Sequence, residues 1–290
     1  MAGIAGPGGK QMVKYNPTQS DDRQKTIVLF GETGAGKSSL VNLMAEKDVA
    51  LTSADMQRCT LKWQEHHISF GGESYTVFDT VGLEEPQLGV KEYLETVENA
   101  YRLVKELDDR GGIDLLLFCV RAGRVTATLQ SNYRLFHEFL CEKKVPIILA
   151  ITNLERENRM EDWWERNEKT FKHYNIDVAG HACITAANRL DGRHKDLYEQ
   201  SRTTMRKIVQ EYTADGRKPA WTGGDNLFVS LMRRLKELLS GESAAAKKKD
   251  LFSGGSLVKR KDLVPRLTKR LGMSQEVAQQ LADMIKKDAV

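Results

Sequence analysis

The sequence predicts an α/β fold, a doubly wound and mostly parallel sheet, from three observations. Short apolar runs alternate with segments of helical periodicity through the first two-thirds of the chain. Most of these runs are almost continuously apolar, as strands covered on both faces are. A glycine-rich loop stands between the first run and the first helical segment. Together these features indicate strand–helix–strand units joined by right-handed crossovers.

The predicted strands and helices follow one another in a regular order. Strands are expected at residues 26–30, 68–70, 76–78, 115–120, 146–151 and 182–184. Helices are expected at residues 38–45, 92–107, 129–140 and 197–212. A further helix is expected to begin near Trp163 and Trp164. We expect one of these rings to pack in the core, and stacking on a bound ligand is the alternative.

Composition divides the chain into three parts. Residues 1–24 are rich in glycine and predict a flexible N-terminal arm. Residues 25–215 contain every predicted strand and should form one domain. Residues 216–290 predict a linker and a basic, mainly helical C-terminal extension, with an amphipathic segment at 227–239 and a last helix capped by Ser274.

Charge is segregated between these parts. The whole chain has a net charge of +4, whereas residues 217–290 contain 16 Lys and Arg against 8 Asp and Glu. The basic clusters at 247–249 and 259–261 fit a solvated linker, a contact with an anionic membrane or nucleic acid, or a docking element for a protein partner. Aromatic residues are nearly absent there, which argues against stacking on single-stranded nucleic acid.

Targeting signals are missing from the sequence. No apolar run reaches the roughly 18–20 residues that a membrane-spanning helix needs, and the N-terminus lacks an apolar signal core. The four cysteines show no paired spacing, which favours reduced thiols over a disulfide or metal framework. We therefore expect a cytoplasmic protein, with peripheral contact to membranes as the remaining option.

Residues 31–38, GETGAGKS, fit the phosphate-binding loop (P-loop) pattern GxxxxGK[ST] completely. Glycines let backbone N–H groups surround the phosphates, Lys37 supplies a point charge, and the Ser38 hydroxyl is a Mg²⁺ ligand. A glycine-rich turn with a chance lysine is the alternative. The residues expected to contact the phosphates are Glu32, Thr33, Gly34, Ala35, Gly36, Lys37, Ser38 and Ser39.

Asp79 and Gly82 belong to a DxxG segment at the end of a predicted strand. The carboxylate can hold Mg²⁺ and the Gly82 N–H can meet a γ-phosphate, although a solvated turn would give the same pattern. A threonine between residues 38 and 68 should complete the Mg²⁺ site; Thr60 is the first choice, with Thr52 and Ser53 as rivals. We expect Ser38, Thr60 and Asp79 to bind the metal, and Lys37, Thr60 and Gly82 to act in catalysis.

The base is expected to be guanine. Asn153 and Glu155 follow the fifth strand, and a carboxylate there can accept hydrogen bonds from guanine N1 and N2, a donor pair that adenine lacks. A charge at the start of a helix is the alternative role of Glu155. Ala186 lies in a short loop whose backbone N–H can meet guanine O6. The substrate and product would be GTP and GDP.

Leu83 stands where many small GTPases have the glutamine that orients the attacking water. A leucine side chain can make no hydrogen bond, so hydrolysis should be slow or use a group from elsewhere. Glu84, Glu85, Arg121 and Arg124 are the candidates.

With these motifs, residues 26–212 resemble the septin-like GTPases, which include the immunity-associated and the chloroplast import-receptor GTPases. The resemblance rests on GETGAGKSS, DTVGL, Gly123-Arg124-Val125-Thr126 and Cys59. The base loop reads TNLE where the immunity-associated branch usually has Lys and Asp. The resemblance implies nucleotide-dependent pairing into a homodimer or oligomer and weak intrinsic hydrolysis.

Three functions fit these observations. The first is a GTPase of low turnover that works as a switch or a self-assembling scaffold. The second is a protein that holds the nucleotide structurally and hydrolyses almost none. The third is a ribosome-assembly GTPase, since such proteins share the P-loop layout and often have basic tails.

Overall fold

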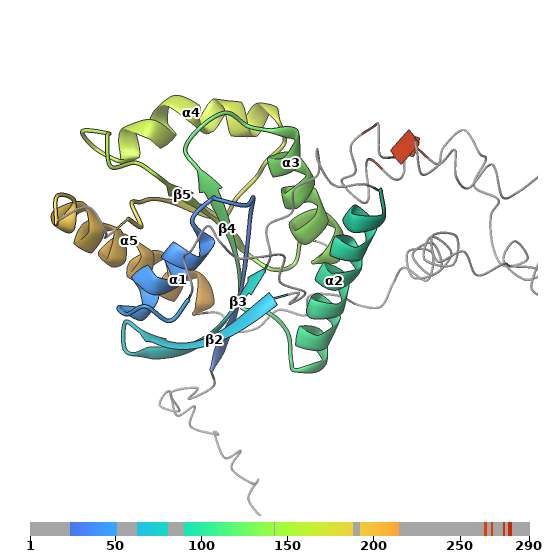
Figure 1. Cartoon of the computed structure of the whole chain (residues 1–290), viewed down its shortest axis with the longest axis horizontal. Coiled ribbons are helices and arrows are strands. Elements are labelled where there is room, and N and C mark those ends of the chain that lie inside the picture. The colour runs from blue at the N-terminus through green and yellow to red at the C-terminus, as the bar shows by residue number, and fades with distance from the viewer. Residues whose placement is uncertain are drawn as a thin grey trace, which may run out of the picture.

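The computed structural model describes residues 24–50, 63–80, 90–141, 143–187 and 192–214, together with Val264, Pro265, Thr268, Gln275, Ala278 and Gln279. A six-stranded sheet with helices on both faces forms the body of the molecule (Figure 1). The strands are β1 (Lys25–Phe30), β2 (Trp63–Phe70), β3 (Glu73–Thr80), β4 (Leu115–Arg121), β5 (Ile147–Thr152) and β6 (Gly180–Cys183). The helices are α1 (Lys37–Ala45), α2 (Val90–Asp109), α3 (Ala127–Tyr133), the π-helix η1 (Arg134–Leu140), α4 (Glu161–His173) and α5 (Lys195–Thr213).

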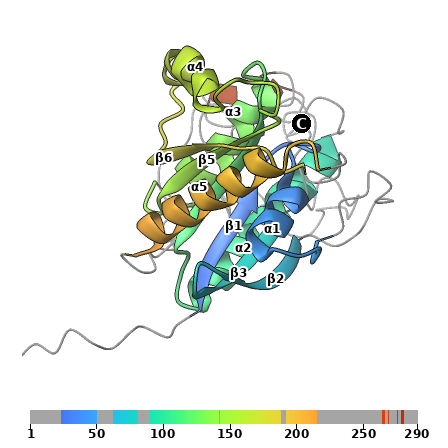
Figure 2. The ribbon, with the colours of Figure 1, turned by 90° about the vertical axis from the view of Figure 1, so that its left-hand side faces the viewer.

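The sheet order is β2-β3-β1-β4-β5-β6, with β2 antiparallel to β3 and all other pairs parallel. Alternate residues of β1 enter two separate cores. Ile27 and Leu29 pack toward α1 and α5, and Val28 and Phe30 pack toward α2, α3 and α4 (Figure 2). The predicted doubly wound, mostly parallel sheet is therefore confirmed.

Strand β1 lies at the point where the strand order reverses, between β3 and β4. In open α/β sheets the crevice beyond the carboxyl ends of the strands at this point is the usual ligand site. The aromatic ring of Phe30 stacks on Phe118 of β4 and on Phe136 of η1, with centroids 4.7 and 4.3 Å apart. This packing fixes the end of β1, from which the P-loop departs.

Two elements differ from their predicted form. The second strand was expected at residues 68–70 but begins at Trp63, because it pairs along its whole length with β3 through a turn at Gly71 and Gly72. The single helix expected at 129–140 is instead α3 followed by η1. The N–H of Cys141 bonds to the carbonyl of Phe136, five residues back, which is the π-helical pattern.

Within the C-terminal extension the six described residues are helical. Ala278 is fully buried in the same core cluster as Phe30, and Val264 packs against that cluster. The segment at 227–239 and the capping residue Ser274 lie outside the described residues, as does the arm up to residue 23. Among the helices that are described, none has the length and apolar character needed to cross a bilayer.

Candidate nucleotide site

The P-loop leaves β1 through Gly31, and any larger residue there would force the backbone of the neighbouring strand to move. A Cβ on Gly31 would stand 2.1 Å from the carbonyl oxygen of Cys119 on the neighbouring strand β4. Gly36 has a φ of +93° and caps helix α1, and its carbonyl accepts the first helical bond from the N–H of Leu40 at 2.8 Å. The loop can therefore lie close to the sheet and present its backbone N–H groups together with the helix N-terminus.

Lys37 is 8% exposed and its ammonium group is held over the loop. Its Nζ donates to the carbonyl oxygens of Gly31 at 3.1 Å and Glu32 at 3.0 Å. These bonds hold the ammonium group against the backbone at the start of the P-loop, while Lys37 itself is the first residue of α1. The arrangement suits phosphate oxygens, which need both backbone donors and a cation.

The carbonyl oxygen of Ala35 ties the P-loop to two strands of the sheet. It accepts hydrogen bonds from Thr152 Oγ1 of β5 at 2.7 Å and from Cys119 Sγ of β4 at 3.1 Å. Burial raises the pKa of Cys119 to about 12, so the thiol stays protonated and can donate. Neither residue belongs to a motif that predicts a role in the site from sequence. The one sequence signal was the position of Thr152, directly before the base-reading loop.

Ser38 and Asp79 meet at the carboxyl ends of β1 and β3. The Ser38 hydroxyl donates to Asp79 Oδ2 at 3.0 Å, and Asp79 is paired in register with Leu29. Burial raises the pKa of the Asp79 carboxyl, while the charge of Lys37 and the Ser38 hydrogen bond act in the opposite direction. A hydroxyl and a buried carboxyl beside a phosphate loop are the hard oxygen donors that Mg²⁺ prefers, so these residues fit the predicted metal.

The two loops expected to contact the base lie together at the other half of the sheet edge. Glu155 is half-buried, and its Oε2 accepts a hydrogen bond from Thr185 Oγ1 at 3.4 Å, directly before the half-buried Ala186. Asn153 is exposed and has a φ of +65°. Helix α4 begins only at Glu161, so Glu155 lies in the loop rather than in a first helical turn. Its alternative role as a helix-start charge is therefore not supported.

The segment of residues 123–126 contacts the P-loop directly. The Thr126 hydroxyl donates to Glu32 Oε1 and also accepts from the N–H of Leu129 at 2.9 Å, which caps α3. One side chain therefore connects the start of α3 to the second residue of the P-loop. The sequence had marked this segment only through its family resemblance.

Other predicted site residues are placed as follows. Thr33 and Gly34 are exposed and Ser39 is half-buried, and Arg121 and Arg124 are exposed near the end of β4. Several others lie outside the described residues and remain predictions: Thr60, Gly82, Leu83, Glu84, Glu85, the rivals Thr52 and Ser53, and Cys59. Trp163 is buried against Phe171, and Trp164 stacks on the ring of His181.

Residues 26–153 match the family model described as "50S ribosome-binding GTPase". The tRNA modification GTPase MnmE of Treponema denticola is 31% identical over 131 residues, which is 43% of this chain and 25% of that protein. GTPase Der of Mycoplasma capricolum is 22% identical over 205 residues, covering 69% of this chain and 45% of that protein. The chain thus spans about a quarter of MnmE and less than half of Der.

Among solved structures, Toc33 of Arabidopsis thaliana is similar at 19% identity and a TM-score of 0.47, covering 67% of this chain and 86% of that one. The P-loop geometry, the Ser38–Asp79 pair at the switch point of a doubly wound sheet, and the family match over residues 26–153 agree with one another. Residues 26–153 therefore match a GTPase family model, and the described part of the chain has the fold of a P-loop GTPase G domain.

Proposed function

We propose that this protein binds GTP and GDP with Mg²⁺, hydrolyses GTP slowly, and acts as a switch or a nucleotide-dependent self-assembling scaffold. The observation that carries the proposal is the convergence of three groups at one sheet edge. They are the Lys37 ammonium over the P-loop, the Ser38–Asp79 pair and the Glu155–Thr185 contact. Each group matches one part of a magnesium nucleotide: the phosphates, the metal and the base.

Guanine specificity rests on Glu155. A carboxylate has two acceptor oxygens, and guanine offers two adjacent donors, N1–H and N2–H. One oxygen of Glu155 is already oriented by Thr185, which is fully buried and whose own N–H is held by Ser201 Oγ at 3.0 Å. This support positions the carboxylate between the loops that follow β5 and β6. Adenine would leave the same carboxylate without matching donors.

Hydrolysis transfers the γ-phosphoryl group of GTP to water, breaking its bond to the β-phosphate oxygen and giving GDP and phosphate. When bound, Mg²⁺ would neutralise charge on the phosphate oxygens. Lys37 would stabilise the same negative charge, but the Leu83 side chain cannot orient a water molecule. Arg121 is the last residue of β4 and Arg124 follows three residues later, and both side chains are exposed, so a second molecule could contact them. We infer that pairing of two G domains supplies the missing group.

We also propose that this protein belongs to the septin-like branch of GTPases. It is supported by the segment of residues 123–126, since Thr126 contacts Glu32 of the P-loop. A change in the P-loop on nucleotide exchange would reach helix α3 through this bond. We further propose a cytoplasmic setting, in which the basic C-terminal extension contacts an anionic membrane surface or a protein partner.

Phosphate release should depend on protein concentration if paired domains catalyse hydrolysis. The specific rate is expected to rise as concentration increases, and light scattering with a non-hydrolysable GTP analogue should show a higher mass than with GDP. Arg124→Ala should lower the specific rate of phosphate release at high protein concentration without changing the rate at low concentration. The control is Arg193→Ala, which removes another exposed arginine. A flat rate with monomers in both nucleotide states, with or without residues 216–290, would instead support a structural nucleotide binder.

A second candidate function is work on ribosomes or tRNA. The match to the ribosome-binding GTPase model over residues 26–153 favours it, as do the names of the MnmE and Der relatives. Co-sedimentation of the GTP-bound chain with ribosomal particles would support this function over the scaffold. Its absence at physiological salt would leave the scaffold as the better account.

A further inference from the structure

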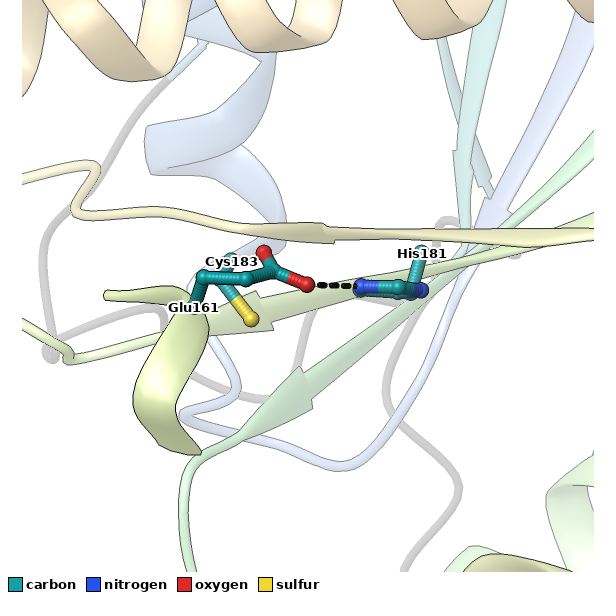
Figure 3. A group of neighbouring side chains, drawn as sticks. All are labelled: Glu161, His181 and Cys183. Atoms are coloured by element: carbon teal, nitrogen blue, oxygen red, sulfur yellow. Dashed lines mark hydrogen bonds and ion pairs between the residues drawn. The ribbon is translucent and has the colours of Figure 1, made fainter. Parts of the chain in front are cut away.

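Three side chains of metal-binding type meet at the edge of the sheet next to the base loops. Glu161 is the first residue of α4, and His181 and Cys183 belong to the edge strand β6 (Figure 3). Because alternate residues of a strand point to the same side, His181 and Cys183 share one face of β6. Helix α4 packs over that face and brings Glu161 to them.

The possible ligand atoms are close enough for one ion. A carboxylate oxygen of Glu161, a ring nitrogen of His181 and the Cys183 sulfur all lie within 4.8 Å of one another. In a tetrahedral zinc site, bonds of about 2.0–2.3 Å place the ligand atoms roughly 3.3–3.8 Å apart. Glu161 Oε1 and His181 Nε2 are in direct contact, so these two atoms would move apart slightly to reach that spacing.

The surroundings hold the set in place. Trp164 stacks on the His181 ring with centroids 4.4 Å apart and an interplanar angle of 21°, which restricts the rotation of the imidazole. The Cys183 side chain is buried and forms no disulfide. The side chains of His181 and Glu161 are 27% and 45% exposed, so an ion can reach the cluster from solvent. Burial, together with the negative charge of Glu161, raises the pKa of the Cys183 thiol to about 12, so the sulfur is protonated in the chain without an ion.

We propose that Glu161, His181 and Cys183 bind a divalent transition metal ion of the Zn²⁺ type, with water in the remaining position. The thiolate and imidazole select such an ion over Mg²⁺ and Ca²⁺, which take oxygen ligands. On binding, the Cys183 proton passes to solvent and a sulfur–metal bond forms. The Glu161–His181 hydrogen bond is replaced by two bonds to the ion.

Such an ion would tie together the two loops that contact the base. Helix α4 follows the loop that contains Glu155, and β6 leads into Thr185 and Ala186. A link between Glu161 and Cys183 would therefore restrict the separation of both loops. This consequence rests on the proposed guanine site, whereas metal binding does not.

Cobalt is a suitable probe, because Co²⁺ bound to a thiolate absorbs in the near ultraviolet and tetrahedral Co²⁺ absorbs in the visible. The full chain is treated with chelator, saturated with Mg²⁺ and GDP, and titrated with Co²⁺. We expect a sulfur–cobalt band that saturates at one ion per chain and is displaced by Zn²⁺. Quenching of Trp164 fluorescence should follow the same curve and be lost in Trp164→Phe.

The band should disappear in Cys183→Ala and the affinity should fall at least tenfold in His181→Ala and Glu161→Gln. Matched controls are Cys141→Ala, another buried cysteine of the same core cluster that forms no disulfide, and His173→Ala, an exposed histidine at the end of α4. Circular dichroism checks folding. If Cys183→Ala does not fold, the Co²⁺ affinity of Glu161→Gln is the deciding measurement. This change keeps the size of the side chain at a partly exposed position, so the variant should fold.

A wild-type chain without the band, or a band that persists in folded Cys183→Ala, would overturn the proposal. So would a Co²⁺ affinity unchanged by Glu161→Gln and His181→Ala. A second titration measures GDP affinity with and without Zn²⁺, and at least a threefold change is expected in the wild type but not in Cys183→Ala. If GDP fails to bind while the band is intact, the guanine proposal fails and the metal site stands.

Discussion

Replacing Lys37 with alanine is expected to weaken GDP and GTP binding by about 10²- to 10⁴-fold while the fold is kept. Lys37 is the buried cation of the P-loop, with its ammonium anchored by the carbonyls of Gly31 and Glu32. A hydrogen bond to a charged group contributes roughly 1.5–3 kcal/mol, so two such bonds to phosphate give about 3–6 kcal/mol. Each factor of ten in affinity corresponds to about 1.4 kcal/mol.

Isothermal titration of GDP in the presence of Mg²⁺ measures this loss directly. The matched control is Lys47→Ala, which removes the same charge from an exposed position just after α1. Circular dichroism of both variants should match the wild type, since alanine suits the first turn of α1. An unchanged GDP affinity in Lys37→Ala would remove the assignment of residues 31–38 as the phosphate site.

Replacing Glu155 with alanine should cost about 2–4 kcal/mol of GDP binding, because two guanine donors lose a charged acceptor. This corresponds to roughly a 30- to 1,000-fold loss of affinity. Glu155 is half-buried beside the fully buried Thr185. Water therefore cannot easily take the place of the missing carboxylate in the variant. Glu165→Ala, an exposed carboxylate on α4, is the control for the change in net charge.

Inosine diphosphate separates a base contact from a general effect on the site, since its base lacks the 2-amino group. The wild type should bind GDP at least tenfold more tightly than inosine diphosphate, because one charged hydrogen bond is missing. In Glu155→Ala the two nucleotides should bind almost equally, which completes a thermodynamic cycle for the contact. A GDP preference that is the same in the variant and the wild type would show that another residue reads the base.

The sheet could be predicted from sequence because its central strands are buried on both faces. Continuous apolar runs mark β1, β4 and β5, and each lies within one or two residues of its expected position. Strand β2 is an edge strand with alternating exposure and two histidines, so only its apolar end at residues 68–70 gave a signal. Its remaining residues are set by pairing with β3, which no local pattern encodes.

The π-helix shows a similar limit. The sequence at residues 129–140 has ordinary helical periodicity, and a helix was correctly expected there. The change to π-helical bonding at η1 accompanies the stacking of Phe136 on Phe30, which is more than a hundred residues away in the chain. Tertiary packing of this kind decides the helix type and cannot be seen in local periodicity.

At the site, the contiguous P-loop was predictable because one short segment supplies the turn, the cation and the helix start. The residues that hold the loop in place could not be predicted from sequence. Thr152 and Cys119 reach the carbonyl of Ala35 from β5 and β4, and Thr126 reaches Glu32 across 94 positions of sequence. These contacts join ordinary residues from separate strands, so they become visible only once the strand order is known.

The cysteines illustrate the same point. Their spacing gave no metal pattern, yet Cys183 lies beside His181 and Glu161 in the folded chain. A histidine and a cysteine two residues apart on a strand are too common to indicate a site by themselves. The third group comes from the start of α4, twenty positions before His181. Only the packing of α4 on β6 brings the set together.

Competition between nucleotides on the wild-type chain tests the central claim most directly. Fluorescently labelled GDP is bound in Mg²⁺ and displaced by GTP, GDP, ATP and ADP, with and without excess chelator. We predict that GTP and GDP displace the label at least a hundredfold more effectively than ATP and ADP, and that removing Mg²⁺ weakens GTP binding by tenfold or more. Equal displacement by ATP, or binding of the label that does not depend on Mg²⁺ and persists in Lys37→Ala, would contradict a magnesium guanine-nucleotide site at this edge of the sheet.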